Sequence, residues 1–121
     1  MFLGLRTVIY HVPDLAKAKA WYAAAFKVAP YFDEPFYVGF EIGGYELGLH
    51  PRAAEITVGD NVAAYWGVPD IAEAYAHLVS RGAAPRDPIM DVGEGIKVGT
   101  VADPFGNVIG VIENPHFSVK T

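Results

Sequence analysis

The chain contains no cysteine among its 121 residues. Disulfide bonds, thiolate metal sites and cysteine nucleophiles are therefore excluded. The sequence also lacks an apolar run of the roughly 20 residues that a membrane-spanning helix requires. Its first stretch, MFLGLRTVIYHV, carries an arginine and no small-residue cleavage pattern, so we expect a strand there and not a signal peptide. These absences predict a cytoplasmic protein.

Positive charge is scarce as well. The formal net charge is −5, and the sequence has neither a run of like charges nor a basic patch. This balance argues against nucleic acid and against an anionic membrane surface as partners, and it is mildly permissive for cationic ligands. With 52% hydrophobic and 19% charged residues, the chain can bury a core. Its length suits a single domain over residues 1–121.

An internal repeat is the most informative feature that is present. VPDLAKAKA at residues 12–20 matches VPDIAEAYA at residues 68–76, and each copy follows a short apolar stretch that we expect to be a strand. Each copy then opens a helix, with Asp14 and Asp70 as N-caps. Glu73 forms a capping-box-like pair with Asp70, and Gly82 is expected to end the second helix.

Hairpins follow each predicted helix. FYVGFEIGGYELGLHP reads as two strands joined by Gly43-Gly44, and IKVGTVADPFGNVIGVIE reads as two strands joined by a turn over residues 103–107. We expect one further short strand near residues 31–32 and its counterpart near residues 89–90. The stretch VGEGIKVG is interpreted as a mobile hairpin loop, not as a phosphate-binding loop. The prediction is an α+β fold of two βαβββ modules, about 1–56 and 57–121.

Two βαβββ units, V-P-D-[LI] at the start of each helix and D-P-x-G-N before the last strand together resemble the vicinal oxygen chelate superfamily. This superfamily includes glyoxalase I, fosfomycin and bleomycin resistance proteins, and extradiol dioxygenases. The resemblance implies paired modules that form a curved sheet with a ligand-binding cleft. It also implies that modules pair either within one chain or across a homodimer, and we expect a homodimer.

The cleft face of the sheet can be assigned because side chains alternate along a strand. Counting outward from Gly43-Gly44 places Glu41 opposite Glu46. The resemblance implies that the first strand is a parallel neighbour of the second hairpin strand with Thr7 beside Glu46, which places His11 beside His50. The resemblance implies that this face, rather than the helix-covered one, lines the cleft. Its predicted ligand-binding residues are Thr7, Ile9, His11, Tyr37, Glu41, Glu46, Gly48, His50, Ala63, Tyr65, Val108 and Gly110.

The metal site of the superfamily usually takes one His or Glu from each of four strands. The resemblance places these four positions at Thr7, Glu46, Ala63 and Gly110. Glu46 alone retains a ligand, whereas a catalytic divalent metal normally needs about three. We therefore expect no cofactor and no metal centre. The alternative is a divalent metal relocated to Glu46 with His11 or His50.

The remaining polar and small residues each allow two interpretations. His11 and His50 either bind a metal or an anion, or end the sheet near solvent. Glu41 opposite Glu46 requires a protonated acid, water or a bound cation, unless both lie at a solvated edge. Tyr37 and Tyr65 are either ligand-stacking rings or core. Gly48, Gly67 and Gly110 leave room for a flat or bulky ligand.

Two functional hypotheses remain open. The first is a small-molecule-binding protein of the glyoxalase/bleomycin-resistance type, which lacks the usual metal and binds a hydrophobic or cationic ligand. The second is a lyase, isomerase or dioxygenase of the same superfamily, with a relocated metal or with Glu46 as a metal-free catalytic base. The sequence leaves open whether the protein is an enzyme.

Overall fold

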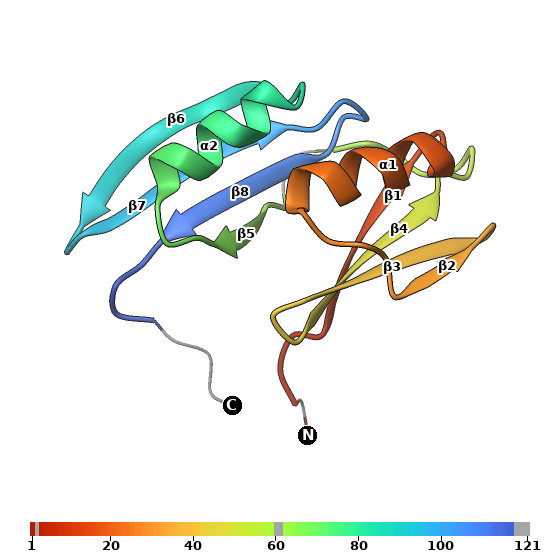
Figure 1. The fold of residues 1–121 in the computed structure, drawn as a ribbon, viewed down its shortest axis with the longest axis horizontal. Coiled ribbons are helices and arrows are strands. Elements are labelled where there is room, and N and C mark those ends of the chain that lie inside the picture. The colour runs from red at the N-terminus through yellow and green to blue at the C-terminus, as the bar shows by residue number, and fades with distance from the viewer. Residues whose placement is uncertain (2, 60–61, 118–121) are drawn as a thin grey trace. The chain divides into compact units, whose positions relative to one another are not determined.

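The computed structural model describes residue 1 and residues 3–59 and 62–117. The chain divides into two compact units, Met1–Val58 and Gly59–Thr121, here called unit one and unit two. Each unit has one helix and four strands (Figure 1). The apolar stretch before the second copy of the repeat begins at residue 61, and this residue lies outside the described residues. The elements are β1 (Thr7–Val12), α1 (Leu15–Phe26), β2 (Phe32–Glu34), β3 (Tyr37–Ile42), β4 (Tyr45–Pro51), β5 (Ala64–Gly67), α2 (Ile71–Ser80), β6 (Ala84–Gly93), β7 (Ile96–Ala102) and β8 (Val108–Glu113).

The two sheets have the same topology. Their strand orders are β1-β4-β3-β2 and β5-β8-β7-β6, with the first-named pair of each sheet parallel and the others antiparallel. The α+β fold of two βαβββ modules is therefore confirmed. The predicted register of unit one is also confirmed, since Thr7 pairs with Glu46, His11 with His50, and Glu41 with Glu46.

Each helix begins where its sequence motif predicts. The side chains of Asp14 and Asp70 accept hydrogen bonds from the backbone N–H groups three residues on, at 3.1 Å in both helices. The N–H of Ile71 donates instead to the Glu113 carboxylate at 2.9 Å, which the sequence did not indicate. Helix α2 ends at Ser80, shortly before Gly82. Among the described residues, no helix combines the length and the apolar character needed to cross a membrane.

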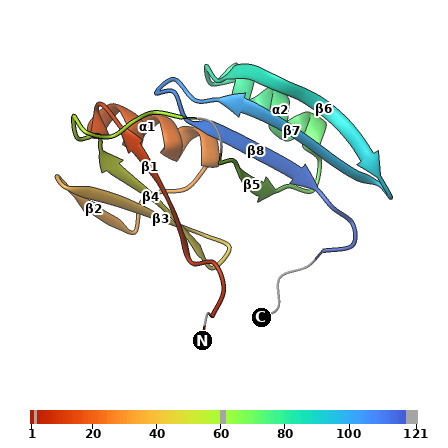
Figure 2. The same ribbon diagram turned by 180° about the vertical axis from the view of Figure 1, so that it is seen from behind.

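The helices cover one face of each sheet. In unit one Tyr22 of α1 is fully buried, and its ring lies 5.9 Å from that of Tyr10 on β1. In unit two α2 lies in front of its sheet in Figure 1 and behind it in Figure 2. The helix-covered face of unit one buries Val38, Phe40 and Leu47 from alternate strand positions. The opposite face of that sheet is consequently left for polar and aromatic side chains.

Strand β6 corrects two predictions. It extends over ten residues, whereas the sequence indicated a short strand near residues 89–90, and it meets β7 in a tight turn at Glu94-Gly95 in place of the predicted loop. Pro85 and Pro88 would interrupt a central strand, but β6 lies at the edge of its sheet, where one side of the backbone needs no ladder partner. Three register shifts accommodate the irregular sequence.

Candidate functional site

The face of the unit one sheet opposite α1 is strongly acidic. Register and alternation place Glu34, Glu41 and Glu46 on it, and β1 to β4 contribute no Lys or Arg to it. We call this surface the acidic face. Its side chains come from Thr7, Ile9, His11, Phe32, Glu34, Tyr37, Glu41, Glu46 and His50, with Gly39 and Gly48 between them.

Glu46 is the centre of a hydrogen-bonded cluster on this face. Its Oε1 accepts from the hydroxyl of Thr7 at 2.9 Å and from that of Tyr37 at 3.0 Å. Its Oε2 accepts from the hydroxyl of Tyr31. Thr7 lies on β1, Tyr37 on β3 and Tyr31 just before β2, so the sheet brings together donors that are up to 30 residues apart in sequence (37 − 7 = 30). The carboxylate is thus fixed in position by the fold.

Two paired glycines make room for this cluster. Gly39 and Gly48 are direct partners on β3 and β4. A Cβ at Gly48 would overlap the Tyr37 hydroxyl and lie 2.7 Å from its Cζ, and a Cβ at Gly39 would lie 2.8 Å from Glu46 Oε2. Real Cβ atoms do not approach other atoms so closely. The space above Gly48, which the sequence assigned to a ligand, is therefore filled by the Tyr37 ring.

The cluster keeps Glu46 ionised and its tyrosines protonated. Hydrogen bonds from Tyr31, and then from Thr7 and Tyr37, lower the pKa of Glu46 against the opposing effect of partial burial. Burial and the hydrogen bond to Glu46 raise the pKa of Tyr37 to about 12. The hydrogen bond to Glu46 also raises the pKa of Tyr31. A lowered pKa makes Glu46 a weaker base, which works against the metal-free catalytic role.

Acidification should weaken unit one through Glu46. The pKa of Glu46 is lower in the folded chain than in the unfolded chain. Its ionised carboxylate therefore stabilises the fold fully at pH values above the unfolded-state pKa, and this stabilisation is lost as the pH falls through the folded-state pKa. We expect the difference in free energy of unfolding between wild type and Glu46→Gln to shrink as pH falls from about 6 to about 3. Urea titrations across this range measure it. A difference that grows on acidification contradicts the assignment.

Glu41 explains how two acids stand opposite each other without a bound cation. Its carboxylate accepts a hydrogen bond from the backbone N–H of Gly44 in the hairpin turn, at 3.0 Å. Glu46 is directed to its three hydroxyl donors instead. Each carboxylate is thus held by hydrogen bonds that do not involve the other.

Aromatic rings extend across the acidic face in contact with one another. The centroids of His11 and His50 are 5.4 Å apart, those of His50 and Tyr37 6.5 Å, and those of Tyr37 and Phe32 6.0 Å. Phe36 continues the row at 6.1 Å from Phe32. We call these five residues the ring strip. Phe36 is 63% exposed and Phe32 38%, so one end of the strip presents apolar rings to solvent.

The donor set does not fit the metal that the resemblance implies. Among the described residues, no three His, Asp or Glu side chains gather closely enough to hold a metal ion, and Glu46 with His11 and His50 is no exception. Nδ1 of His50 lies 3.0 Å from the carbonyl oxygen of Pro51. Three hydroxyls surround the Glu46 carboxylate where a metal would need further carboxylate or imidazole ligands. We therefore derive no chemistry through a metal.

In unit two the corresponding face is differently built. Gly110 pairs with Tyr65, and a Cβ at Gly110 would lie 2.6 Å from Tyr65 Cδ1 and 2.9 Å from the carbonyl oxygen of Ala64. The glycine thus accommodates the protein's own ring, not a ligand as the sequence suggested. Ala63 is exposed and precedes β5, and Val108 is buried opposite Ala102. Tyr65, Val108 and Gly110 nevertheless lie on one face of the neighbouring strands β5 and β8, as the predicted alternation requires.

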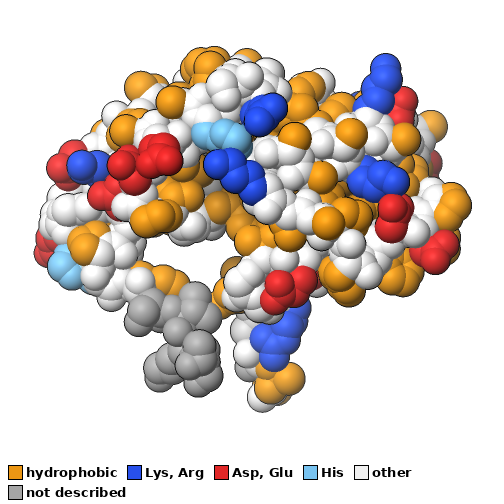
Figure 3. Space-filling view, in the orientation of Figure 1, with side chains coloured by type: hydrophobic (Ala, Val, Ile, Leu, Met, Phe, Trp, Pro, Cys, Tyr) orange, Lys and Arg blue, Asp and Glu red, His pale blue; other side chains and the backbone are white. Residues whose placement is uncertain are grey.

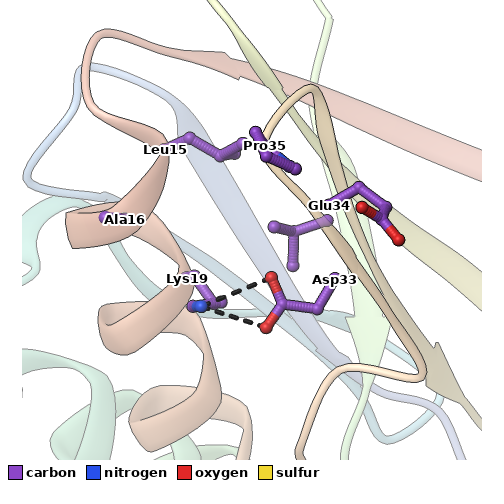
Figure 4. A pocket seen from close by; sticks show the side chains of 7 residues that line it. Leu15, Ala16, Lys19, Asp33, Glu34 and Pro35 are labelled. Carbon is purple, nitrogen blue, oxygen red and sulfur yellow. Dashed lines mark hydrogen bonds and ion pairs between the residues drawn. The ribbon is translucent and has the colours of Figure 1, made fainter.

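A hollow of about 410 Å³ lies on the other side of the unit one sheet, between α1 and the β2–β3 hairpin (Figure 4). Lys19 and Asp33 cross it in an ion pair, with Nζ 3.0 Å and 3.3 Å from the two carboxylate oxygens. The charges of Lys19 and Asp33 neutralise each other. Glu34, at the edge strand β2, also lines this hollow, whereas Glu46 does not. We therefore place the candidate site on the acidic face, where the charge is not balanced within unit one.

Sequence reasoning missed three aromatic residues of the site, Tyr31, Phe32 and Phe36. They occupy YFDEPFY, residues 31–37, where four of seven residues are aromatic. This density of aromatic residues could have indicated that the segment contributes to the site. The prediction of a short strand there left their orientation open, because Tyr31 lies just outside β2 and the direction of its side chain does not follow from strand alternation.

Comparison with known proteins agrees with the fold. Residues 4–111 match the family model of the Glyoxalase/Bleomycin resistance protein/Dioxygenase superfamily. Among solved structures, a glyoxalase-related enzyme from Fulvimarina pelagi is 21% identical with a TM-score of 0.82, covering 99% of this chain and 94% of its own. Lactoylglutathione lyase from Agrobacterium tumefaciens is 18% identical with a TM-score of 0.77, covering 99% of this chain and 100% of its own.

TioX from Micromonospora sp. ML1 is 18% identical to this chain with a TM-score of 0.74, and the match covers 91% of this chain and 98% of TioX. A search of curated proteins found no match. At these identities the solved structures show the fold alone, while the family model spans most of the chain. This protein belongs to the Glyoxalase/Bleomycin resistance protein/Dioxygenase superfamily.

Proposed function

We propose that the protein is a small-molecule-binding member of its superfamily that takes an aromatic, cationic ligand on the acidic face of unit one without a metal. The observation that carries this proposal is an ionised carboxylate, Glu46, fixed beside a strip of aromatic rings. A carboxylate supplies the counter-charge and the rings supply stacking surface, which together favour a flat cation over a neutral or anionic ligand.

Charge complementarity supports the cation. The acidic face carries Glu41 and Glu46 at facing strand positions, and strands β1 to β4 contribute no Lys or Arg to it. In Figure 3 several Lys and Arg side chains lie next to Asp or Glu side chains. Because the pKa of Glu46 is lowered, its charge is present throughout the neutral pH range. The negative charge of this surface would repel an anion, and a neutral ligand would gain no electrostatic attraction from that charge.

Exposed aromatic area supports the flat ligand. Tyr31, which donates to Glu46, is 62% exposed. Phe36, at the end of the ring strip, is 63% exposed. Aromatic side chains that remain in solvent beside a polar anchor are typical of binding surfaces, because their burial by a ligand releases water from apolar area. Tyrosine hydroxyls held by Glu46 also keep the neighbouring rings in fixed orientations.

The test compares acridine with N-methylacridinium in mildly alkaline buffer, where acridine is uncharged and both molecules have nearly the same flat shape. We expect the cation to bind about tenfold more tightly, which corresponds to about 1.4 kcal/mol. Fluorescence anisotropy of the probes gives both dissociation constants. The variant Glu46→Gln should remove most of this preference, since it deletes the counter-charge but retains one acceptor oxygen.

Glu41→Gln is the matched control. It removes a carboxylate from the facing strand position, but the Glu41 side chain accepts a hydrogen bond from the backbone of the hairpin turn, whereas the tyrosine hydroxyls donate to Glu46. We expect it to keep most of the cation preference. Equal binding of the two acridines by the wild type, or equal loss of preference in both variants, would contradict a specific role for Glu46. No binding of either probe would remove the proposed function.

A further inference from the structure

The two oxygens of the Glu46 carboxylate are not equivalent. Oε1 accepts two hydrogen bonds, from Thr7 and Tyr37, which lie on the strands flanking β4. Oε2 accepts from Tyr31 alone among the described residues. An ionised carboxylate offers about four acceptor positions, two on each oxygen. Oε1 is thus saturated by the strands of the sheet, and Oε2 retains one acceptor position.

We infer that the ligand is a protonated aromatic amine or nitrogen heterocycle whose N–H donates to Oε2 of Glu46, and that Tyr31 competes for this oxygen. This inference rests on the proposed function and specifies the ligand further. A quaternary ammonium would use the charge of Glu46 but leave the open acceptor position unfilled. A donor that fills it makes a charge-assisted hydrogen bond, which is roughly twice as strong as a neutral one.

Tyr31 donates to the same oxygen as the ligand would, so the two donors share its negative charge. Tyr31 lies just before β2, its side chain is 62% exposed, and its backbone N–H is fixed to the carbonyl of Gly39 at 3.0 Å. A Cβ at Gly39 would lie 2.8 Å from Oε2 and 3.1 Å from Cε1 of Tyr31, so glycine leaves room there for this oxygen and for its tyrosine donor. Tyr37 is half-buried above Gly48 by comparison and lies within strand β3. Access from solvent therefore favours Oε2 over Oε1.

The experiment uses two cations, N-methylacridinium and an aminoacridinium that is protonated on its ring nitrogen. Both are flat and positively charged in mildly alkaline buffer, but the first has no N–H. We expect the full-length wild type to bind the aminoacridinium about tenfold more tightly, a preference that Glu46→Gln abolishes. Tyr31→Phe should raise affinity for the aminoacridinium about threefold and leave N-methylacridinium nearly unchanged, because the competing hydroxyl is gone.

Thr7→Val is the matched control, because it removes one hydroxyl donor from Oε1 and keeps the side-chain shape. It should give no comparable gain for the aminoacridinium. If both cations bind equally and both bind better than acridine, this inference is wrong and the proposed function stands. A preference for the aminoacridinium that persists in Glu46→Gln also overturns it. If no probe binds, the inference and the proposed function fall together.

Discussion

Replacing Gly48 by alanine should lower the free energy of unfolding by about 1–3 kcal/mol and weaken binding of N-methylacridinium. The new Cβ would overlap the Tyr37 hydroxyl and lie 2.7 Å from Cζ and 2.9 Å from Cε1 of the same ring. The ring must therefore move, and its hydrogen bond to Glu46 is lost with it. Urea unfolding measures the first effect and probe anisotropy the second.

Gly67→Ala is the control for this prediction. Gly67 also lies in a strand, but a Cβ added there meets no atom within 4 Å, and its φ is not among the positive ones. We expect a change within about 0.5 kcal/mol. In a Tyr37→Ala background, the cost of Gly48→Ala should fall because the obstructing ring is absent. An equal cost of Gly48→Ala in both backgrounds would show that the steric explanation is wrong.

Replacing Asp103 by alanine should lower the free energy of unfolding by about 2–4 kcal/mol. Asp103 is 5% exposed, and its Oδ1 accepts from the backbone N–H groups of Phe105 at 2.8 Å and Asn107 at 2.7 Å. Its Oδ2 accepts from the Asn107 side chain at 3.2 Å. The substitution deprives this turn between β7 and β8 of charge-assisted hydrogen bonds and leaves partly buried donors unsatisfied. Urea unfolding checks the size of the loss.

Asp91→Ala is the matched control for Asp103→Ala. Asp91 also accepts a hydrogen bond from the N–H two residues on, that of Gly93, at 2.8 Å, but it is exposed at the end of β6. Water can replace that bond, so we expect a loss below about 1 kcal/mol. Equal losses for the two variants would mean that burial of Asp103 contributes little. The pair thus compares a buried carboxylate that accepts three hydrogen bonds with an exposed one that accepts a single bond from the N–H two residues on.

Local rules predicted most of the backbone. The repeat placed both helices, the N-caps Asp14 and Asp70 followed from their position before apolar helical spacing, and the Gly43-Gly44 turn fixed the register that brings Glu41 opposite Glu46. Each of these depends on residues that are neighbours in sequence or are connected by a tight turn. The prediction was wrong for β6, because the tolerance of an edge strand for proline depends on its place in the sheet.

The sequence by itself determined the order of helices and strands, the register of the β3–β4 hairpin and the face on which Glu46 lies, because backbone geometry and side-chain alternation are local properties. Only the tertiary structure decided what surrounds Glu46. It brought Tyr31 to Oε2, filled the space above Gly48 with Tyr37, and turned Glu41 toward Gly44. Those outcomes depend on distances through space between side chains from separate strands. They set the pKa and the open acceptor position of Glu46, on which the proposed binding depends.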